Sequence, residues 1–87
     1  METPIKYFVY ILESLKDSKF YIGQTNNLQN RLKRHNAGHV KATTHRRPLK
    51  LVYQETYASR SEALKREKYL KDLKSHTYIK NIILDSR

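Results

Sequence analysis

The longest wholly apolar stretch of this 87-residue chain is the six-residue segment 7–12, Tyr-Phe-Val-Tyr-Ile-Leu. Its aromatic and β-branched residues favour a strand, and the lack of a polar alternation predicts a strand buried on both faces. We therefore expect residues 6–13 to form the central strand of a small sheet. The stretch is far shorter than the roughly 20 residues that a membrane-spanning helix needs.

The rest of the chain divides into elements of similar length, with no repeat and no linker, so we expect a single domain over residues 1–87. Asn26-Asn27 can cap a helix that Gly38 ends, and Ser59 with Glu62 forms a capping box for a second helix. The predicted order is β-β-α-β-α-α, an α+β fold with a three-stranded antiparallel sheet. The expected elements are a strand at 6–13, a turn at 14–18, a strand at 19–24, a helix at 27–37, a basic loop at 39–47, a strand at 49–57, and helices at 60–74 and 76–84.

The charge of the chain points to an acidic partner. Lysine and arginine number 18 against 8 acidic residues, which gives a formal net charge of +10. A nucleic acid is the favoured partner for a small chain with this charge, while acidic lipid or an acidic protein are the alternatives. Cysteine is absent and the N-terminus, Met-Glu-Thr-Pro, does not resemble a signal peptide. We therefore expect a cytoplasmic protein with no membrane partner and no small-molecule cofactor.

Two tyrosines and a helical pair are candidates for chemistry. Tyr10 and Tyr21 point to the same face of the sheet if the hairpin turn is centred on residues 16 and 17, because the partner numbers then sum to an odd value. Arg31 and His35 are one helical turn apart, beside a stripe made by Leu28 and Leu32. Taken singly, each tyrosine fits an ordinary structural role, and a basic helix face is commonly solvated.

Glu67 is a carboxylate at an apolar position. In the helix that begins near residue 60, it falls within the buried arc marked by Ala63 and Leu70. Burial of an unpaired carboxylate is costly, so Glu67 needs a cation, hydrogen bonds or a metal ion. A salt bridge to Lys71 or Lys74 is the alternative that the helix alone favours.

Taken in order, these residues resemble the GIY-YIG nuclease family over nearly the whole chain. Val9-Tyr10 matches the end of the first motif and Tyr21-Ile22-Gly23 matches the second motif intact. Phe8 stands where the first motif has glycine, and Gln24 stands where many relatives have lysine. By resemblance, Arg31 is the catalytic arginine, His35 a site residue and Glu67 the metal ligand, while Asn81 is a loose match for a late asparagine.

The resemblance implies a metal-dependent endonuclease that hydrolyses phosphodiester bonds in DNA with Mg²⁺ or Mn²⁺. Tyr10 would be the base, Tyr21 its partner, and Gly23 would allow a close approach of the backbone. We expect Tyr10, Tyr21, Arg31, His35 and Glu67 to converge on one surface cleft. The other histidines, His39, His45 and His76, are expected at the surface.

The nucleic acid would be held by basic residues outside the catalytic set. Loops on a rigid scaffold commonly carry binding groups, and the segment around residues 41–50 is rich in lysine and arginine. Two other functions remain open: a binding module that keeps the fold without efficient catalysis, and a scaffold that associates with RNA. The expected backbone-contacting residues are Lys33, Arg34, Lys41, Arg46 and Arg47.

Overall fold

The computed structural model describes residues 5–86, so the N-terminal Met-Glu-Thr-Pro segment lies outside the described part of the chain. The element order is β-β-α-β-α-α, as the sequence predicts, and the boundaries differ from the expected ones by one or two residues. A short 3₁₀ helix, Thr44–Arg46, is additional. The elements are β1 (Tyr7–Ser14), β2 (Phe20–Thr25), α1 (Leu28–Asn36), β3 (Leu49–Tyr57), α2 (Arg60–Asp72) and α3 (His76–Asp85).

The three strands form one antiparallel sheet in the order β2-β1-β3, which confirms β1 as the central strand. The hairpin pairs Tyr10 with Gly23 and Leu12 with Tyr21. Because side chains alternate along a strand, these four residues share one face of the sheet, while Val9 lies on the other. Tyr10 and Tyr21 are therefore on the same face, as predicted.

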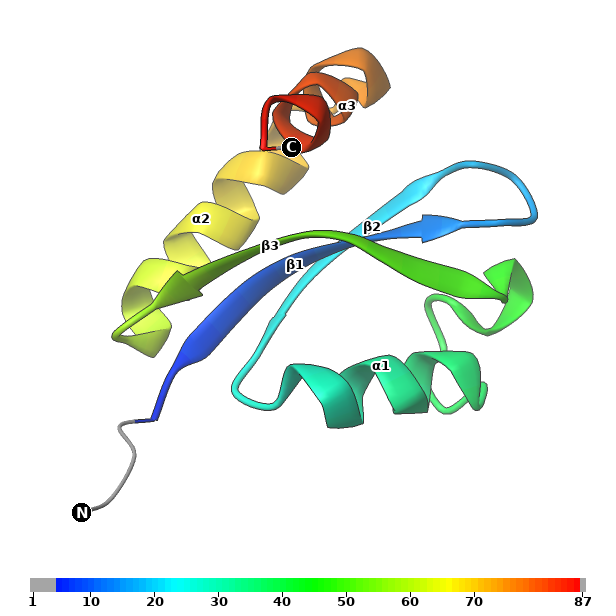
Figure 1. Ribbon diagram of the computed structural model, residues 1–87, viewed down its shortest axis with the longest axis horizontal. Coiled ribbons are helices and arrows are strands. Elements are labelled where there is room, and N and C mark those ends of the chain that lie inside the picture. Colours follow the sequence, from blue (N-terminus) through cyan, green and yellow to red (C-terminus); the bar gives the residue numbers. More distant parts are fainter. Residues whose placement is uncertain (1–4, 87) are drawn as a thin grey trace.

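Helices cover both faces of the sheet, with α1 on one side and α2 and α3 on the other (Figure 1). The larger core lies under α2 and α3, where Val9 and Ile11 of β1 pack against Ala63, Leu70 and Ile79. A smaller core lies under α1. Its buried members are Tyr10, Leu12 and Leu49, with Tyr21, Leu28, Leu32 and Leu51 packed against them.

The ends of α1 follow from the residues that flank it. The side chain of Asn27 accepts a hydrogen bond from the backbone N–H of Asn30 at 3.1 Å. At the other end, Gly38 has φ of 84°, and the N–H of His39 bonds to the carbonyl of Arg34 at 3.0 Å. Glycine adopts this left-handed conformation without a steric penalty, so Gly38 ends the helix as expected.

The segment after α1, predicted as a basic loop over residues 39–47, exposes His39, Lys41, His45 and Arg47 but is also anchored to the core. Val40 and Thr43 are buried, and the 3₁₀ helix follows them. The side chain of Asn36 fixes the segment at both backbone groups of Leu49, donating to its carbonyl at 3.1 Å and accepting from its N–H at 2.8 Å. These two hydrogen bonds hold the start of the segment against β3.

A polar cluster joins α2 to β3, the edge strand on the other side of β1 from β2. Arg66 donates hydrogen bonds to both carboxylate oxygens of Glu55, at 3.0 and 3.2 Å from its Nε. The hydroxyls of Tyr53 and Tyr57 donate to the same carboxylate. These hydrogen bonds hold the pKa of the Glu55 carboxyl below its ordinary value, although burial alone would raise it.

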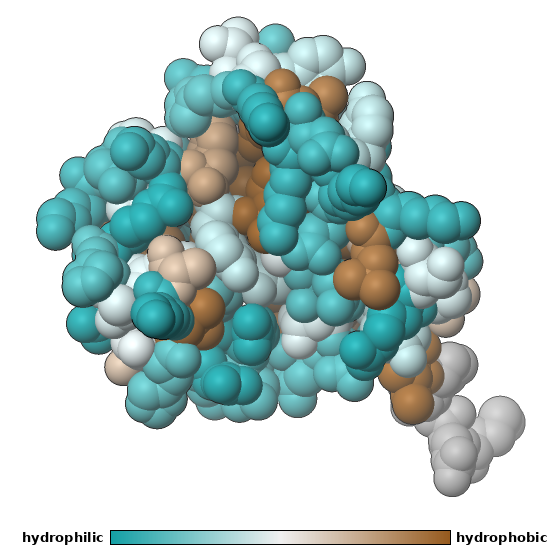
Figure 2. Space-filling model, turned by 180° about the vertical axis from the view of Figure 1, so that it is seen from behind, coloured by the Kyte–Doolittle hydropathy of each residue, from teal (hydrophilic) through white to brown (hydrophobic). Residues whose placement is uncertain are grey.

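The surface on the β2 side is largely hydrophilic, with hydrophobic side chains visible at the bottom of a hollow (Figure 2). Over residues 5–86, every helix is too short or too polar to span a bilayer.

Candidate functional site

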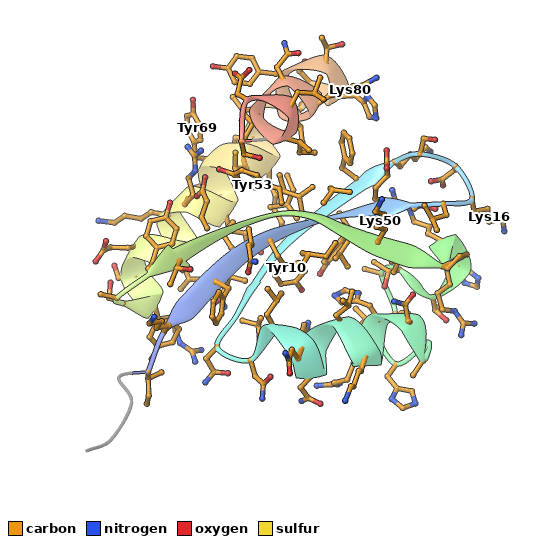
Figure 3. The ribbon with its side chains drawn as sticks, in the orientation of Figure 1. Tyr10, Lys16, Lys50, Tyr53, Tyr69 and Lys80 are labelled. Atoms are coloured by element: carbon orange, nitrogen blue, oxygen red, sulfur yellow. The ribbon has the colours of Figure 1, made fainter. Side chains whose placement is uncertain are left out.

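The two predicted tyrosines meet beneath α1. Their ring centroids are 6.3 Å apart, and Tyr10 is only 1% exposed. Figure 3 shows Tyr10 between the sheet and α1. The Tyr10 hydroxyl lies over Gly23 of β2, so close that a Cβ added to Gly23 would be 2.5 Å from the hydroxyl oxygen. Gly23 is therefore needed to make room for the Tyr10 side chain, a more specific role than the backbone approach that we expected.

His35 joins Tyr10 to the segment that follows α1. Its Nε2 is 3.0 Å from the Tyr10 hydroxyl, and its Nδ1 is 2.7 Å from the Thr43 hydroxyl. The Thr43 hydroxyl also lies 3.4 Å from the carbonyl of Val40, to which it can donate. In that arrangement Thr43 accepts from Nδ1–H, and Nε2 accepts a hydrogen bond from Tyr10.

The burial of His35 corrects the expectation that it lies at the flank of α1. His35 is 0% exposed, whereas Leu28 and Leu32 are only partly buried. The physical reason is that Tyr10 and Thr43 satisfy both ring nitrogens, so the imidazole can fill the smaller core. Burial lowers the pKa of His35 to about 4, and the positive charges of Arg31 and Arg34 act in the same direction. His35 is therefore neutral near pH 7 and has no free nitrogen for a phosphate.

Arg31 stands beside both tyrosines on the exposed side of this cluster. Its guanidinium lowers the pKa of Tyr10, against the larger effect of burial, which raises that pKa. The tyrosine hydroxyl in turn raises the pKa of Arg31. The Nε of Arg31 is buried and has no hydrogen-bond partner within residues 5–86. An unpaired buried donor is costly, so this N–H is well suited to an anionic ligand.

Glu67 reaches the site from the other helical layer. It lies on α2, which covers the face opposite to α1, so the five predicted residues do not gather on one face of the sheet. Its side chain is 17% exposed and bonds to Lys71 at 2.8 Å, the salt bridge that the sequence offered as the alternative. The charge of Glu67 nevertheless raises the pKa of Tyr10. This coupling is consistent with both groups lying near the β2 edge of the sheet.

Comparison with known proteins identifies the family. Residues 6–80 match the GIY-YIG catalytic domain, a nuclease domain. The chain belongs to the GIY-YIG family. It is 44% identical to a UPF0213 protein of Staphylococcus haemolyticus over 78 residues, 88% of this chain and 94% of that protein.

Two further relatives agree with this assignment. A UPF0213 protein of Bacillus licheniformis is 46% identical over 74 residues, 84% of this chain and 74% of that protein. The solution structure of a UPF0213 protein from Bacillus halodurans is similar in fold, with a TM-score of 0.58 and 34% identity. That match covers 90% of this chain and 82% of the solved one. The GIY-YIG fold predicted from the sequence is therefore confirmed.

A metal ion in this GIY-YIG domain would be coordinated by a single carboxylate of the protein. No group of three histidine or acidic side chains in residues 5–86 is arranged to hold a metal. Mg²⁺, however, is commonly bound by one or two carboxylates together with substrate phosphate oxygens and water. Glu67 fits that pattern, since it is half-buried, its charge raises the pKa of Tyr10, and within residues 5–86 it bonds to the exposed ammonium group of Lys71.

Other residues that the sequence singled out lie around the GIY-YIG site or away from it. Asn81 is exposed on α3 and takes no part in the hydrogen bonds around Tyr10. Arg46 is half-buried, with its Nε 3.7 Å from Asp17. His76 is exposed, as expected, but stacks on Phe20 at a centroid distance of 4.4 Å. The exposed predicted residues are Lys33, Arg34, Lys41, Arg47, His39 and His45.

Sequence reasoning missed Thr43, the second partner of His35. Thr43 is eight residues beyond His35 and outside any helix or strand, so no periodicity connects the two. The structure also gives Gln24 an unusual environment. Its Oε1 is buried with no hydrogen-bond partner in the described part of the chain, on the face of β2 that α2 covers.

Proposed function

We propose that this chain is a divalent-metal-dependent endonuclease that hydrolyses phosphodiester bonds in DNA with weak sequence selectivity. The observation that carries the proposal is the placement of Arg31, with an unpaired Nε, beside the Tyr10 hydroxyl that is hydrogen-bonded to a buried, neutral His35. Phosphodiester hydrolysis needs an acceptor for the proton of the attacking water and a cation for the phosphate. Tyr10 and Arg31 supply these two groups within one cluster.

Tyr10 acts as the base through its hydrogen bond to His35. As the attacking water transfers a proton to the Tyr10 oxygen, the phenol proton moves to Nε2 of His35. Thr43 holds the Nδ1–H tautomer, in which Nε2 is unprotonated and can accept that proton. The low pKa of His35 opposes this transfer in the free protein, partly because of the charge of Arg31. A phosphate bound to Arg31 offsets that charge and makes His35 a better acceptor.

Arg31 binds a phosphate oxygen and stabilises the charge that grows on it during attack. The guanidinium is planar, offers several N–H donors and stays protonated at every relevant pH. Its buried Nε has no hydrogen-bond partner within residues 5–86, so turning the guanidinium toward a phosphate would break no hydrogen bond of that atom. Tyr21 lies beside Tyr10 and its hydroxyl also acts on Arg31, so it can donate to the same phosphate.

Glu67 would hold a Mg²⁺ or Mn²⁺ ion, with phosphate oxygens and water as the other ligands. The bound ion would supply Lewis-acid stabilisation of the leaving oxygen. Lys71 now neutralises the carboxylate, and its exposed ammonium group can turn toward solvent when the ion binds. The release costs little, because a salt bridge with one exposed partner contributes about 0–1 kcal/mol.

DNA binding would depend mainly on charge. The exposed lysines and arginines on α1 and in the following loop surround the site, and the whole chain carries +10. Contacts to phosphates position a nucleic acid but do not read its sequence. Raising the salt concentration should therefore weaken binding to all sequences alike.

The decisive experiment measures nicking of branched, nicked and linear DNA with Mg²⁺ or Mn²⁺, for wild type and for Glu67→Gln. We expect cleavage only with metal, and a loss of roughly 100-fold or more in Glu67→Gln, since the metal accounts for several kcal/mol of transition-state stabilisation. Glu62→Gln is the matched control, because it removes the same charge from an exposed position of the same helix. Cleavage by Glu67→Gln at the wild-type rate would refute the role of Glu67.

One observation favours a second function, a binding module of the same fold without efficient catalysis. The Glu67 carboxylate is already bonded to Lys71 at 2.8 Å, which competes with a metal ion. In that case wild-type protein would bind DNA without nicking any of the three substrates with either metal, and Glu67→Gln would lower the melting temperature, because it removes the salt bridge to Lys71.

A further inference from the structure

A groove runs along the outer edge of β2, on the opposite side of Tyr21 from α1. Its volume is about 470 Å³, and it lies between the β1–β2 hairpin and the end of α2 with the start of α3. Figure 2 faces this edge and shows hydrophobic side chains at the bottom of the hollow with hydrophilic ones on both sides. Tyr21 and Lys71 also belong to the proposed catalytic site, but no residue of the apolar floor has a role in the proposed reaction.

The floor of the groove is apolar and partly aromatic. Phe20 and Ile22 of β2 face Leu70 of α2 and Ile79 of α3 across it. The Phe20 ring is stacked on His76 with an interplanar angle of 11°, and Nε2 of His76 is 3.0 Å from the carbonyl of Ser18. His76 thus covers one face of the Phe20 ring, and both aromatic side chains belong to residues that line the groove.

The rim of the groove is basic. Lys19, Arg46, Lys71 and Lys74 line it, and the acidic partners of Arg46 and Lys71, which are Asp17 and Glu67, are not among the residues that line it. The Nε of Arg46 is buried and has no hydrogen-bond partner within residues 5–86, since Asp17 is 3.7 Å away. An unpaired buried donor among four cations favours an anionic group at the rim.

Two contacts connect the groove to the proposed catalytic site. Tyr21 is one of the residues that line the groove, and its side chain packs beside Tyr10 under α1. Lys71 also lines the groove and is bonded to Glu67. A chain that crosses the site at Arg31 can therefore continue into the groove past Tyr21.

We propose that this groove is a subsite for one nucleotide of the substrate strand, next to the phosphate that is cleaved. The base lies on the floor formed by Phe20 and Ile79, and the phosphate of that nucleotide is held at the rim by Lys19 and Arg46. Stacking on aromatic side chains together with lysine and arginine contacts to phosphate is the usual way in which proteins hold an individual nucleotide. The inference rests on the proposed function, because it assigns a further part of the same substrate.

The test is a titration of metal-free, ¹⁵N-labelled protein with deoxyadenosine 5′-monophosphate, followed by amide chemical shifts. Deoxyadenosine and inorganic phosphate serve as separate probes. We expect shifts at residues 19–22 and 70–79, and weaker binding of either half-ligand. Shifts confined to α1, or the same shifts with inorganic phosphate alone at equal affinity, would overturn the assignment.

Two variants test the contributions of the floor and of the rim to nucleotide binding separately. Phe20→Leu keeps an apolar floor without the ring, and Lys19→Glu reverses an exposed charge without touching the core. Each should weaken binding of the mononucleotide about fivefold or more, because stacking and charge contacts are each worth at least that factor. Lys80→Glu, an equal charge change on α3 away from the groove, is the control. An equal loss in Lys80→Glu would mean that net charge alone drives binding, and would refute the subsite.

Cleavage kinetics distinguish this inference from the proposed function. In a cleaving protein, the groove variants should raise KM for an oligonucleotide and leave kcat unchanged. The mononucleotide titration needs no cleavage, so a protein that binds the nucleotide in the groove but does not cleave DNA refutes the nuclease proposal alone. A protein that cleaves DNA but does not bind the mononucleotide there refutes the subsite alone.

Discussion

Replacement of His35 by glutamine should remove a pH dependence of folding stability that the buried imidazole creates. In the folded chain the pKa of His35 is about 4, because burial and the nearby arginine charges disfavour the protonated ring. In the unfolded chain the ordinary pKa is about 6.5. Below pH 6.5 the unfolded chain therefore binds a proton that the folded chain does not, and stability falls as the pH decreases toward 4.

The expected magnitude follows from these two pKa values. Between pH 7 and pH 5, the single proton of His35 lowers the free energy of unfolding by about 2 kcal/mol. His35 is fully buried, so solvent does not screen this effect. Two kcal/mol is a large part of the 5–15 kcal/mol that holds a typical domain folded. The window from pH 5 to pH 7 lies above the ordinary titration range of carboxylates, which keeps their contribution small.

The assay is urea unfolding, followed by far-ultraviolet circular dichroism, for wild type and His35→Gln at several pH values from 5 to 7. Glutamine keeps a polar side chain that can bond to Tyr10 or Thr43 but does not titrate. The wild-type free energy should fall by about 2 kcal/mol more than that of the variant across this range. Parallel curves for the two proteins would refute the claim that His35 stays neutral in the fold.

Three further substitutions test the surroundings of the site. Gly23→Ala should destabilise the fold by about 1–3 kcal/mol and reduce cleavage, because the new methyl group occupies the position of the Tyr10 hydroxyl; unchanged melting temperature and cleavage rate would contradict this. Thr43→Val keeps the shape of the side chain but removes the acceptor of His35 Nδ1–H, so it should lower kcat, whereas Thr43→Ser should retain kcat. Equal cleavage rates for the two variants would show that the His35 tautomer does not affect the reaction. Glu55→Gln should cost about 1–3 kcal/mol of stability in thermal unfolding, since a half-buried guanidinium loses its counter-charge, while cleavage by the folded protein stays unchanged.

Local patterns were sufficient to predict the sheet. The uninterrupted apolar character of residues 7–12 gave the central position of β1, and the centre of the hairpin turn gave the register that places Tyr10 and Tyr21 on one face. Both features depend on neighbours in the sequence and on the strict alternation of strand side chains. The helix ends at Gly38 and Ser59 were equally predictable, because capping is a local hydrogen-bonding effect.

The contacts around His35 could not be predicted in this way. Periodicity placed Leu28 and Leu32 on the buried side of α1, which left the histidine at the flank. Its burial depends on Thr43, which comes from an irregular segment, and on a tyrosine hydroxyl 25 residues away in the sequence. A buried polar side chain is stable only when its partners are in place, and those partners are set by tertiary structure.

The face of the sheet that the helix of Glu67 covers was a second feature that could not be predicted from the sequence. Helical spacing correctly indicated a half-buried carboxylate near Ala63, but a helix wheel does not say which face of the sheet the helix covers. Because β2 is an edge strand, a helix on either face can approach the same border of the sheet. The charge of Glu67 raises the pKa of Tyr10 although α2 covers the face of the sheet opposite to the one from which the Tyr10 side chain projects.

The small core under α1 couples the chemistry to folding. Tyr10 is one of its three buried members and His35 is buried beside it, so the two groups that we propose to move the proton also fill the core. A substitution at either position removes packing and hydrogen bonds together, and its loss of cleavage can come from either cause. Glu67 differs, because its partner within residues 5–86 is the exposed ammonium group of Lys71, and its removal should leave the core intact. Cleavage that is lost in Glu67→Gln at unchanged melting temperature is therefore the result that assigns the loss to the reaction rather than to the fold.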